Sequence, residues 1–211
     1  MERIPDGTKR QYSSSLRAEQ AELTRRRVVT AAHLLFLSRG YAGTTVEAVA
    51  GDAGVSPQTV YNAVGGKAAL LAAVHAGLLA DEVPGVPDPS GAADGRALLR
   101  EYAKVARRLG ERVTPLLAVA QAAAGDRDVR AFLDTVELQR TIGTHQVAAE
   151  IAVRFGLKPD VDQQTAGDIV WTLTSTEVAD RLVTQRQWGW DRFEEWLALT
   201  LADALLGPAD G

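Results

Sequence analysis

Hydrophobic and polar positions repeat with helical spacing along most of the chain. The clearest apolar stripe lies in the segment 21–39, which Gly40 is expected to end. Its members, at positions i, i+3, i+4, i+7 and i+8, are Val28, Ala31, Ala32, Leu35 and Phe36. Few segments alternate strictly between apolar and polar residues, as half-buried strands do. The pattern therefore predicts an all-α fold of about nine helices, near residues 21–39, 45–52, 56–62, 67–81, 96–110, 113–124, 127–155, 161–187 and 190–206.

The segment TTVEAVAGDAGVSPQTVYNAVGGK, which begins at Thr44, predicts two short helices joined by a tight turn. Thr44 begins a capping box with a glutamate three residues later, and Gly54 can take the left-handed conformation that ends a helix. Ser56 and Pro57 are typical of the cap and the first position of the next helix. Because proteins use this arrangement to place a helix in the major groove of DNA, the segment indicates a DNA-binding helix-turn-helix.

Composition predicts how the chain is organised around this motif. Residues 1–20 are polar and are expected to form a flexible arm. Residues 21–66 hold the helix-turn-helix, and residues 67–211 hold the remaining helices. Within these, residues 82–95 are rich in Pro and Gly and lack periodicity, which predicts a linker or mobile loop. The arm could enter a minor groove of DNA through its cations, which are Lys9, Arg10 and Arg17.

Charge is distributed unevenly along the 211 residues. The net charge is −4, but residues 1–80 carry nine Lys and Arg against six Asp and Glu, whereas residues 81–211 carry fourteen against twenty-one. A basic head on an acidic body fits phosphate contact at one end of the molecule. The chain has no cysteine, which excludes disulfides and thiolate metal sites. No secretory signal or long apolar run is present, so we expect a cytoplasmic protein and no membrane span.

Motifs of catalysis are missing from the sequence. Its three histidines, His33, His75 and His145, lie far apart, and there is no H-E-x-x-H pair. There is also no G-x-S-x-G, P-loop or dinucleotide fingerprint. We therefore expect no catalytic residue, no metal and no cofactor, and we expect that the protein is not an enzyme. The alternatives are a helical ligand-binding protein whose DNA-binding head has decayed and, less favoured by these patterns, an all-α enzyme.

Residues 24–74 resemble the N-terminal DNA-binding region of the TetR (tetracycline-repressor) family of bacterial regulators. The matching pieces, in register, are AAxxLFxxxGY-x-x-TT, the AGVS turn, Val60-Tyr61 and Gly-Lys-x-x-Leu. The resemblance implies a ligand-responsive repressor that binds a pseudo-palindromic operator as a homodimer and is released by a small molecule. It also implies that residues 67–211 bind the effector and form the dimer, and that effector binding moves the 67–81 helix and changes the separation of the heads.

The chain departs from the family pattern at three positions. The aromatic pair that commonly follows the recognition tyrosine is replaced by Ala63 and Val64, and the acidic residue that commonly follows the lysine is replaced by Ala68. The loss of an aromatic ring removes one expected phosphate contact. An unusual operator preference is the expected consequence, and these departures also motivate the alternative of a decayed head.

The expected DNA contacts surround the second helix of the motif, because its N-terminal residues reach base edges. Gln58 and Asn62 can pair with adenine, and Thr59 can pack on a thymine methyl group. Tyr61 suits a phosphate, and Lys67 with its helix N-terminus would converge on another phosphate. The opposing interpretation is an ordinary solvated helix surface, which applies equally to the arginine cluster 25–27. The complete expected set is Thr44, Thr45, Ser56, Pro57, Gln58, Thr59, Tyr61, Asn62 and Lys67.

The C-terminal helices supply candidates for the effector pocket and for the dimer interface. The pocket candidates, each of which could equally be packing, are Tyr102, Phe132, Arg140, His145 and Trp171. The last helix carries an unusually complete apolar stripe, and one recognition helix reads too few base pairs for a specific site. We therefore expect this stripe, with the 161–187 helix beside it, to form a two-fold interface of four helices, with an ordinary core helix as the alternative. Its members are Phe193, Trp196, Leu197, Thr200, Leu201 and Ala204.

Overall fold

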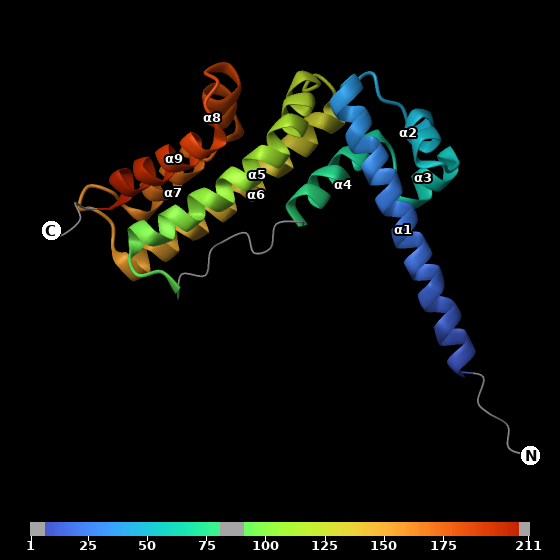
Figure 1. Ribbon diagram of the computed structural model, residues 1–211, viewed down its shortest axis with the longest axis horizontal. Helices are drawn as coiled ribbons and strands as arrows, with labels where there is room; N and C mark the ends of the chain where they lie inside the picture. The colour runs from blue at the N-terminus through green and yellow to red at the C-terminus, as the bar shows by residue number, and fades with distance from the viewer. Residues whose placement is uncertain (1–6, 81–90, 207–211) are drawn as a thin grey trace, which may run out of the picture. The chain divides into compact units, whose positions relative to one another are not determined.

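The structure is a computed structural model that describes residues 7–80 and 91–206. Within these ranges it contains nine α-helices, one short π-helix and no strand, which confirms the all-α fold (Figure 1). The helices are α1 (Gly7–Arg39), α2 (Val46–Ala53), α3 (Pro57–Ala63), α4 (Lys67–Ala80), α5 (Gly95–Ala122), α6 (Arg127–Phe155), α7 (Gln163–Leu173), α8 (Thr176–Ala179), the π-helix η2 (Asp180–Gln185) and α9 (Trp190–Leu205).

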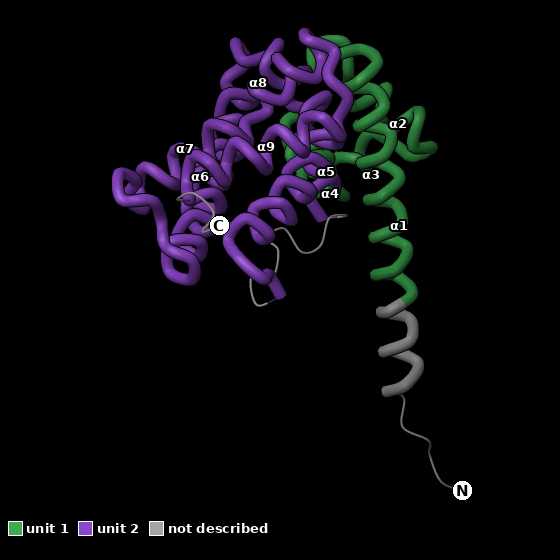
Figure 2. Tube along the Cα trace, turned by 60° about the vertical axis from the view of Figure 1, so that its left-hand side comes forward, with its two compact units in different colours: residues 1–77 green, residues 78–211 purple. Residues whose placement is uncertain are grey.

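The chain forms two compact units, residues 1–77 and residues 78–211 (Figure 2). The functional boundary expected at residue 67 falls at the first residue of α4, and we retain it as a proposal. Most of the expected linker, residues 82–95, lies outside the described residues.

The N-terminal unit is built on the apolar stripe of α1, as the sequence predicts. Val28, Ala32 and Phe36 are completely buried, and α2 and α3 pack against this helix and against each other. Phe36 also stacks on Tyr41, with ring centroids 5.8 Å apart. The remainder of this core comes from the other helices of the unit, through Val46, Val49, Ala50, Ala53, Val60, Leu70, Leu71 and Val74.

Helix α1 is longer than the periodicity predicts. It begins at Gly7 rather than near Ala21, so the expected arm is largely helical. Residues 16–22 are exposed, so burial of an apolar face does not explain the extension. These residues include good helix formers and no glycine or proline, and backbone hydrogen bonds continue from the packed part of the helix. The start of the helix was predicted wrongly because the prediction relied on an apolar stripe, and an exposed part of a helix carries no such stripe.

The turn of the helix-turn-helix follows the predicted chemistry with one shift. Gly54 has φ 64° and its N–H donates to the carbonyls at the end of α2, as expected of a left-handed cap. Ser56 caps α3, and Pro57 is its first residue. The cap of α2, however, is Thr45, whose hydroxyl accepts from the Ala48 N–H at 3.1 Å. Thr44 was therefore assigned the wrong role: it is completely buried, and its hydroxyl donates to the Gly40 carbonyl.

The C-terminal unit packs α5 along α9 and α6 along α7. Its largest core cluster draws on all four of these helices and on α8. The side chains buried in this cluster include Leu98, Leu99, Val147, Ile151, Val170, Ala179, Phe193, Leu197, Leu201 and Leu205.

Two helix boundaries in this unit were predicted wrongly. The segments 96–110 and 113–124 are one helix, α5, which contains Pro115 in its interior. Gly110, at the expected end of the first segment, faces Trp190: a Cβ at this position would lie 3.1 Å from the Trp190 ring. It is therefore a site of close packing rather than a helix end.

The expected helix 161–187 is broken into α7, α8 and η2. The break falls at a run of hydroxyl residues that satisfy the exposed backbone groups locally. Thr174 Oγ1 donates to the Val170 carbonyl at 2.8 Å, and Ser175 caps α8 by accepting from the Val178 N–H at 3.2 Å.

Over the described ranges, no single helix is both long and apolar enough to cross a membrane. The pair α3 and α4 reaches that length and composition when taken together, but the two helices are bent by 56° at their junction.

Candidate nucleic-acid interface

The exposed face of α3 carries the polar side chains that the sequence assigns to base reading. Val60 is completely buried, whereas Gln58, Tyr61 and Asn62 are exposed and Thr59 is half-buried. Gln58 Nε2 donates to Asn62 Oδ1 at 3.0 Å, so the two amides are held on one side of the helix. Each amide keeps both donor and acceptor capacity beyond this bond. The arrangement suits hydrogen bonding to base edges in a major groove.

The N-terminus of α3 is ordered by its own hydroxyl groups. The Ser56 hydroxyl accepts from the Thr59 N–H at 3.1 Å and lies 2.8 Å from the Thr59 hydroxyl. The pair fixes the first turn of the helix, where base-contacting residues are expected.

Two arginines of α1 hold the C-terminal ends of α2 and α3. Arg25 Nη1 donates to the carbonyl of Ala63, the last residue of α3, at 3.0 Å. Arg27 Nη2 donates to the carbonyl of Ala53, the last residue of α2. The final carbonyls of a helix lack intrahelical partners and carry the negative end of its dipole, so a guanidinium satisfies both needs.

The predicted basic cluster 25–27 thus divides into three separate roles. Arg26 forms an exposed ion pair with Glu22 at 3.0 Å, whereas its two neighbours in the cluster bond to helix ends. Sequence reasoning missed the helix-end contacts because their partners lie 38 and 26 residues away along the chain. The first and third arginines of this cluster therefore donate hydrogen bonds to the helix-turn-helix itself.

Lys67 is anchored within the N-terminal unit. Its Nζ donates to the Tyr41 carbonyl at 2.9 Å and lies 4.2 Å from the centre of the Tyr41 ring. An ammonium group has three donors, so the bond to the carbonyl occupies one of them. A phosphate contact by Lys67 stays a prediction. Thr44, being buried, is removed from the expected DNA contacts, whereas Thr45 is exposed at the start of α2.

Three of the five expected pocket residues come together in the C-terminal unit. Arg140 donates from Nη1 to the Thr174 carbonyl at 3.0 Å and from Nη2 to the Trp171 carbonyl at 2.9 Å. Its guanidinium lies 5.6 Å from the centre of the Trp171 ring. Burial raises the pKa of Tyr102, against the opposing effects of a side-chain hydrogen bond with Thr174 and of the Arg140 charge.

The other two expected pocket residues lie elsewhere in that unit. Phe132 packs against a small core cluster formed by Val113, Leu117 and Val136. His145 Nε2 lies 3.4 Å from an Asp168 carboxylate oxygen, at the contact of α6 with α7. Phe132 and His145 therefore have packing or surface roles, which the alternative interpretation of the sequence allowed.

Three of the six residues of the expected dimer stripe are instead intrachain core. Phe193, Leu197 and Leu201 are 2%, 0% and 0% exposed, because they face the cluster that α5, α6 and α7 build with α9. The expectation that they form an intersubunit surface is therefore corrected. Trp196, Thr200 and Ala204 are half-buried and follow each other at four-residue intervals on another side of α9.

Titratable residues do not gather into a metal centre in the parts of the chain that the structure describes. No group of three or more His, Asp or Glu side chains there is placed to hold a metal ion.

Comparisons with known proteins agree with this geometry. Residues 28–74, which cover most of the N-terminal unit, match the family model described as "Bacterial regulatory proteins, tetR family". None of the curated proteins matches the sequence.

Solved structures are similar over nearly the whole chain. NalD of Pseudomonas aeruginosa, the secondary repressor of the MexAB-OprM multidrug efflux pump, has a TM-score of 0.65 at 23% identity, covering 92% of this chain and 100% of its own. FadR of Bacillus subtilis, a transcriptional regulator solved with stearoyl-CoA, has a TM-score of 0.66 at 16% identity, covering 84% and 97%. Salmonella enterica GusR has a TM-score of 0.68 at 18% identity, covering 86% and 95%.

The family model covers only part of the N-terminal unit, whereas the similarity to these all-helical structures includes the C-terminal unit as well. Together with the family match over residues 28–74 and the exposed amide pair on α3, these similarities show that the chain carries a DNA-binding helix-turn-helix region of the tetR type within a fold similar to that of transcriptional regulators.

Proposed function

We propose that this protein is a ligand-responsive transcriptional repressor that binds a pseudo-palindromic operator as a homodimer in the cytoplasm. The observation that carries the proposal is the amide pair Gln58–Asn62, exposed on α3 and held at the helix end by Arg25. A reading helix must present its polar groups in a defined orientation, and this one is anchored at both of its ends. The description of NalD as a repressor supports the direction of regulation.

The proposed operator contacts follow from the exposed positions. Gln58 and Asn62 read base edges, Thr59 contacts a thymine methyl group, and the peptide N–H groups around Thr45 and Ser56 lie near phosphates together with Tyr61 and Lys67. Residues 21–66 act as the DNA-binding head, as the sequence suggested. Replacement of the family's aromatic pair leaves the head anchored, since the Ala63 carbonyl is the acceptor for Arg25.

We place the dimer contact on the half-buried side of α9. Trp196, Thr200 and Ala204 lie there at four-residue intervals, with the exposed Leu199 beside them. Such a symmetric contact would set two heads about one helical turn apart, about 34–36 Å, on a palindromic site.

We propose that the effector binds near Tyr102, Arg140 and Trp171. Within the described residues, the buried Trp171 indole N–H has no hydrogen-bond partner, and such a group calls for an explanation. Arg140 connects this region to the broken end of α7 through two carbonyls. The structure of FadR in complex with stearoyl-CoA, which has a similar fold, supports the binding of a small molecule by this protein. Coupling between effector and operator sites of this type is typically about 1–3 kcal/mol and reciprocal.

Fluorescence anisotropy tests the proposal directly. The purified protein is titrated onto duplexes from a random-pool selection and onto unrelated duplexes, at several salt concentrations. We expect preferential binding that weakens steeply with salt, because phosphate contacts release counterions. The variant Gln58→Ala should lose about 1–3 kcal/mol of preference at one base pair, whereas Leu34→Ala, at an exposed position of α1 in the same unit, is the matched control. A protein that selects no sequence from the pool would instead be a helical ligand-binding protein with a decayed head.

A further inference from the structure

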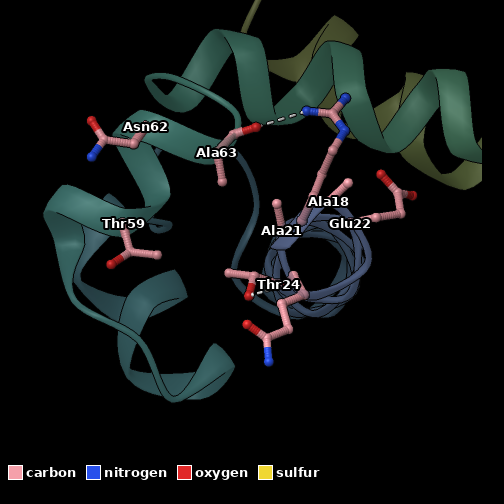
Figure 3. Close-up of a pocket in the computed structure, with 9 residues that line it drawn as sticks. Ala18, Ala21, Glu22, Thr24, Thr59, Asn62 and Ala63 are labelled. Carbon is pink, nitrogen blue, oxygen red and sulfur yellow. Dashed lines mark hydrogen bonds between the residues drawn. The ribbon is translucent and has the colours of Figure 1, made fainter. Parts of the chain in front are cut away.

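A groove of about 660 Å³ runs between α1 and α3 in the N-terminal unit (Figure 3). One wall belongs to α1 and the other to α3, and Figure 3 shows Ala21 and Thr24 on the side of α1 that faces Thr59 and Ala63. The lining residues are Ala18, Gln20, Ala21, Glu22, Thr24, Arg25, Thr59, Asn62 and Ala63.

The α3 wall of the groove is part of the DNA-reading face. Thr59 and Asn62 line the groove, and the same two residues belong to the base-contacting set. A duplex that engages them with its base edges must bring the border of its major groove toward α1. The groove is therefore continuous with the proposed interface.

The α1 wall comes from a part of the helix that is not buried in the core of the unit. Residues 16–22 are exposed and Leu23 is 60% exposed, whereas Val28 is completely buried. Because the side chains of Ala18 and Ala21 are small, a DNA backbone can approach the α1 helix closely at this wall. An exposed helical wall beside the reading helix is thus available for contact without cost to folding.

Polar groups in the groove suit a phosphodiester chain. The Arg25 guanidinium uses one donor for the Ala63 carbonyl, and a guanidinium carries five. The Gln20 amide adds donors one turn away, and the negative charge of Glu22 is compensated by its ion pair with Arg26. Arginine and glutamine donors are common partners of phosphate oxygens.

We propose that the side of α1 that lines the groove, from Ala18 through Ala21 to Arg25, forms a second wall of the DNA site and receives the phosphodiester backbone bordering the major groove that α3 reads. Arg25 then bridges the end of α3 and a phosphate. This inference rests on the proposed DNA-binding function. It assigns the extended part of α1 a backbone contact, which positions the reading helix rather than recognising sequence.

A pair of variants on opposite sides of α1 tests the inference. Ala21→Asp places a carboxylate in the groove, and Leu23→Asp places the same charge on an exposed position outside it. We expect Ala21→Asp to weaken binding to the selected duplex about hundredfold and Leu23→Asp less than about threefold, because only the first meets a phosphate at short range. Both sites are exposed, and circular dichroism checks that both variants keep the helix content of the parent.

A mapping measurement provides an independent readout. Because the chain contains no cysteine, Ala21→Cys and Leu23→Cys each supply a single attachment point for an iron chelate that cleaves nearby DNA. Strong cleavage at the border of the recognised major groove from position 21, with weak cleavage from position 23, supports the proposal.

Equal losses of affinity from the two Asp variants, or unchanged affinity in Ala21→Asp, would overturn the inference and leave the regulator assignment intact. Failure of the parent protein to bind any selected duplex would overturn the proposed function and the inference together.

Discussion

In the N-terminal unit short helices meet at their ends, whereas in the C-terminal unit long helices meet along their sides. Helices α2 and α3 have 8 and 7 residues, and their ends are held by caps and by Arg27 and Arg25. Helices α5 and α6 have 28 and 29 residues and are held by packing against α9 and α7. A reading helix needs a fixed direction, which end contacts provide, whereas a helical body needs buried area.

Arginine plays the same structural role in both units. Arg140 donates to two carbonyls at the end of α7, much as Arg25 and Arg27 do for the helix-turn-helix. The environments differ, since only 21% of the Arg140 side chain is exposed. Arginines thus hold helix ends in both units, and we expect the contribution of each contact to stability to increase with its burial.

The largest expected effect tests whether the buried half of the α9 stripe, which includes Phe193, is core. Phe193→Ala removes a ring that is 2% exposed and lies 5.5 Å from the Trp190 ring, measured between centroids. We expect the free energy of unfolding to fall by about 3–5 kcal/mol in urea denaturation. Leu138→Ala, at a position of α6 that is 62% exposed, should change it by less than about 0.5 kcal/mol. If Phe193→Ala shifted only the monomer–dimer equilibrium, the assignment of this stripe to the core would be wrong.

The next prediction compares helix-end arginines across the units. Arg140→Ala leaves two carbonyls without a charged donor and should cost about 2–3 kcal/mol, whereas the more exposed Arg27→Ala should cost about 1 kcal/mol. Urea denaturation followed by tryptophan fluorescence measures the C-terminal unit, where all four tryptophans lie, and circular dichroism measures both. Lys104→Ala, at an exposed ion pair, serves as the control. If the two variants lost the same free energy of unfolding, burial would not determine how much each arginine contributes to stability.

Helix caps should have similar weight in the two units. Ser56→Ala removes the cap of α3, and Ser175→Ala removes the cap of α8. Each should lower the free energy of unfolding by about 1 kcal/mol, since each leaves one helix N–H without its acceptor. The functional readouts should nevertheless differ: Ser56→Ala weakens operator binding in an anisotropy titration, and Ser175→Ala leaves it unchanged. Replacement of either serine by threonine or aspartate, which also cap, should restore stability.

The smallest expected effect concerns acid. Burial lowers the pKa of His75 and of His33 in the N-terminal unit below the ordinary value of 6.5. As pH falls through 6.5 the unfolded chain takes up protons more readily than the folded one, so stability decreases. In the C-terminal unit, backbone and side-chain hydrogen bonds from Thr165 lower the pKa of Asp162 below 3.8, so its contribution is present above 3.8 and is lost as pH falls further.

We therefore expect acid to loosen the N-terminal unit before it affects the cap of α7. Hydrogen exchange followed between pH 7 and pH 5 measures this order, and His75→Leu should flatten the pH dependence of the N-terminal unit. Loss of protection around α7 over the same pH range, ahead of any change near α4, would contradict the prediction.

The reading motif was predictable nearly residue by residue. Gly54, Ser56 and Pro57 act as expected because their effects depend on groups within a few residues of each. The exposed amides of α3 were also identified correctly as neighbours on one face. The shift of the cap from Thr44 to Thr45 shows the limit of this approach, since either threonine has the required hydroxyl and burial decides between them.

The body of the protein was predicted less well. The break expected near residue 110 and the intersubunit role expected for Phe193, Leu197 and Leu201 were wrong, because both depend on what packs against these positions. Gly167 has the same character: a Cβ there would collide with the His145 ring, so this glycine permits close contact of α7 with α6. No periodic pattern within one helix reveals such a neighbour.

The amino-acid sequence by itself determined the helical class, the apolar stripe of α1 and the turn chemistry of the reading motif, because these depend on interactions between near neighbours along the chain. The tertiary structure decided the partners of Arg25, Arg27 and Arg140, which lie between 26 and 38 residues away. It also decided which face of α9 is buried. The physical reason is that a guanidinium or an apolar face can satisfy itself against many surfaces, and only the packed fold selects one.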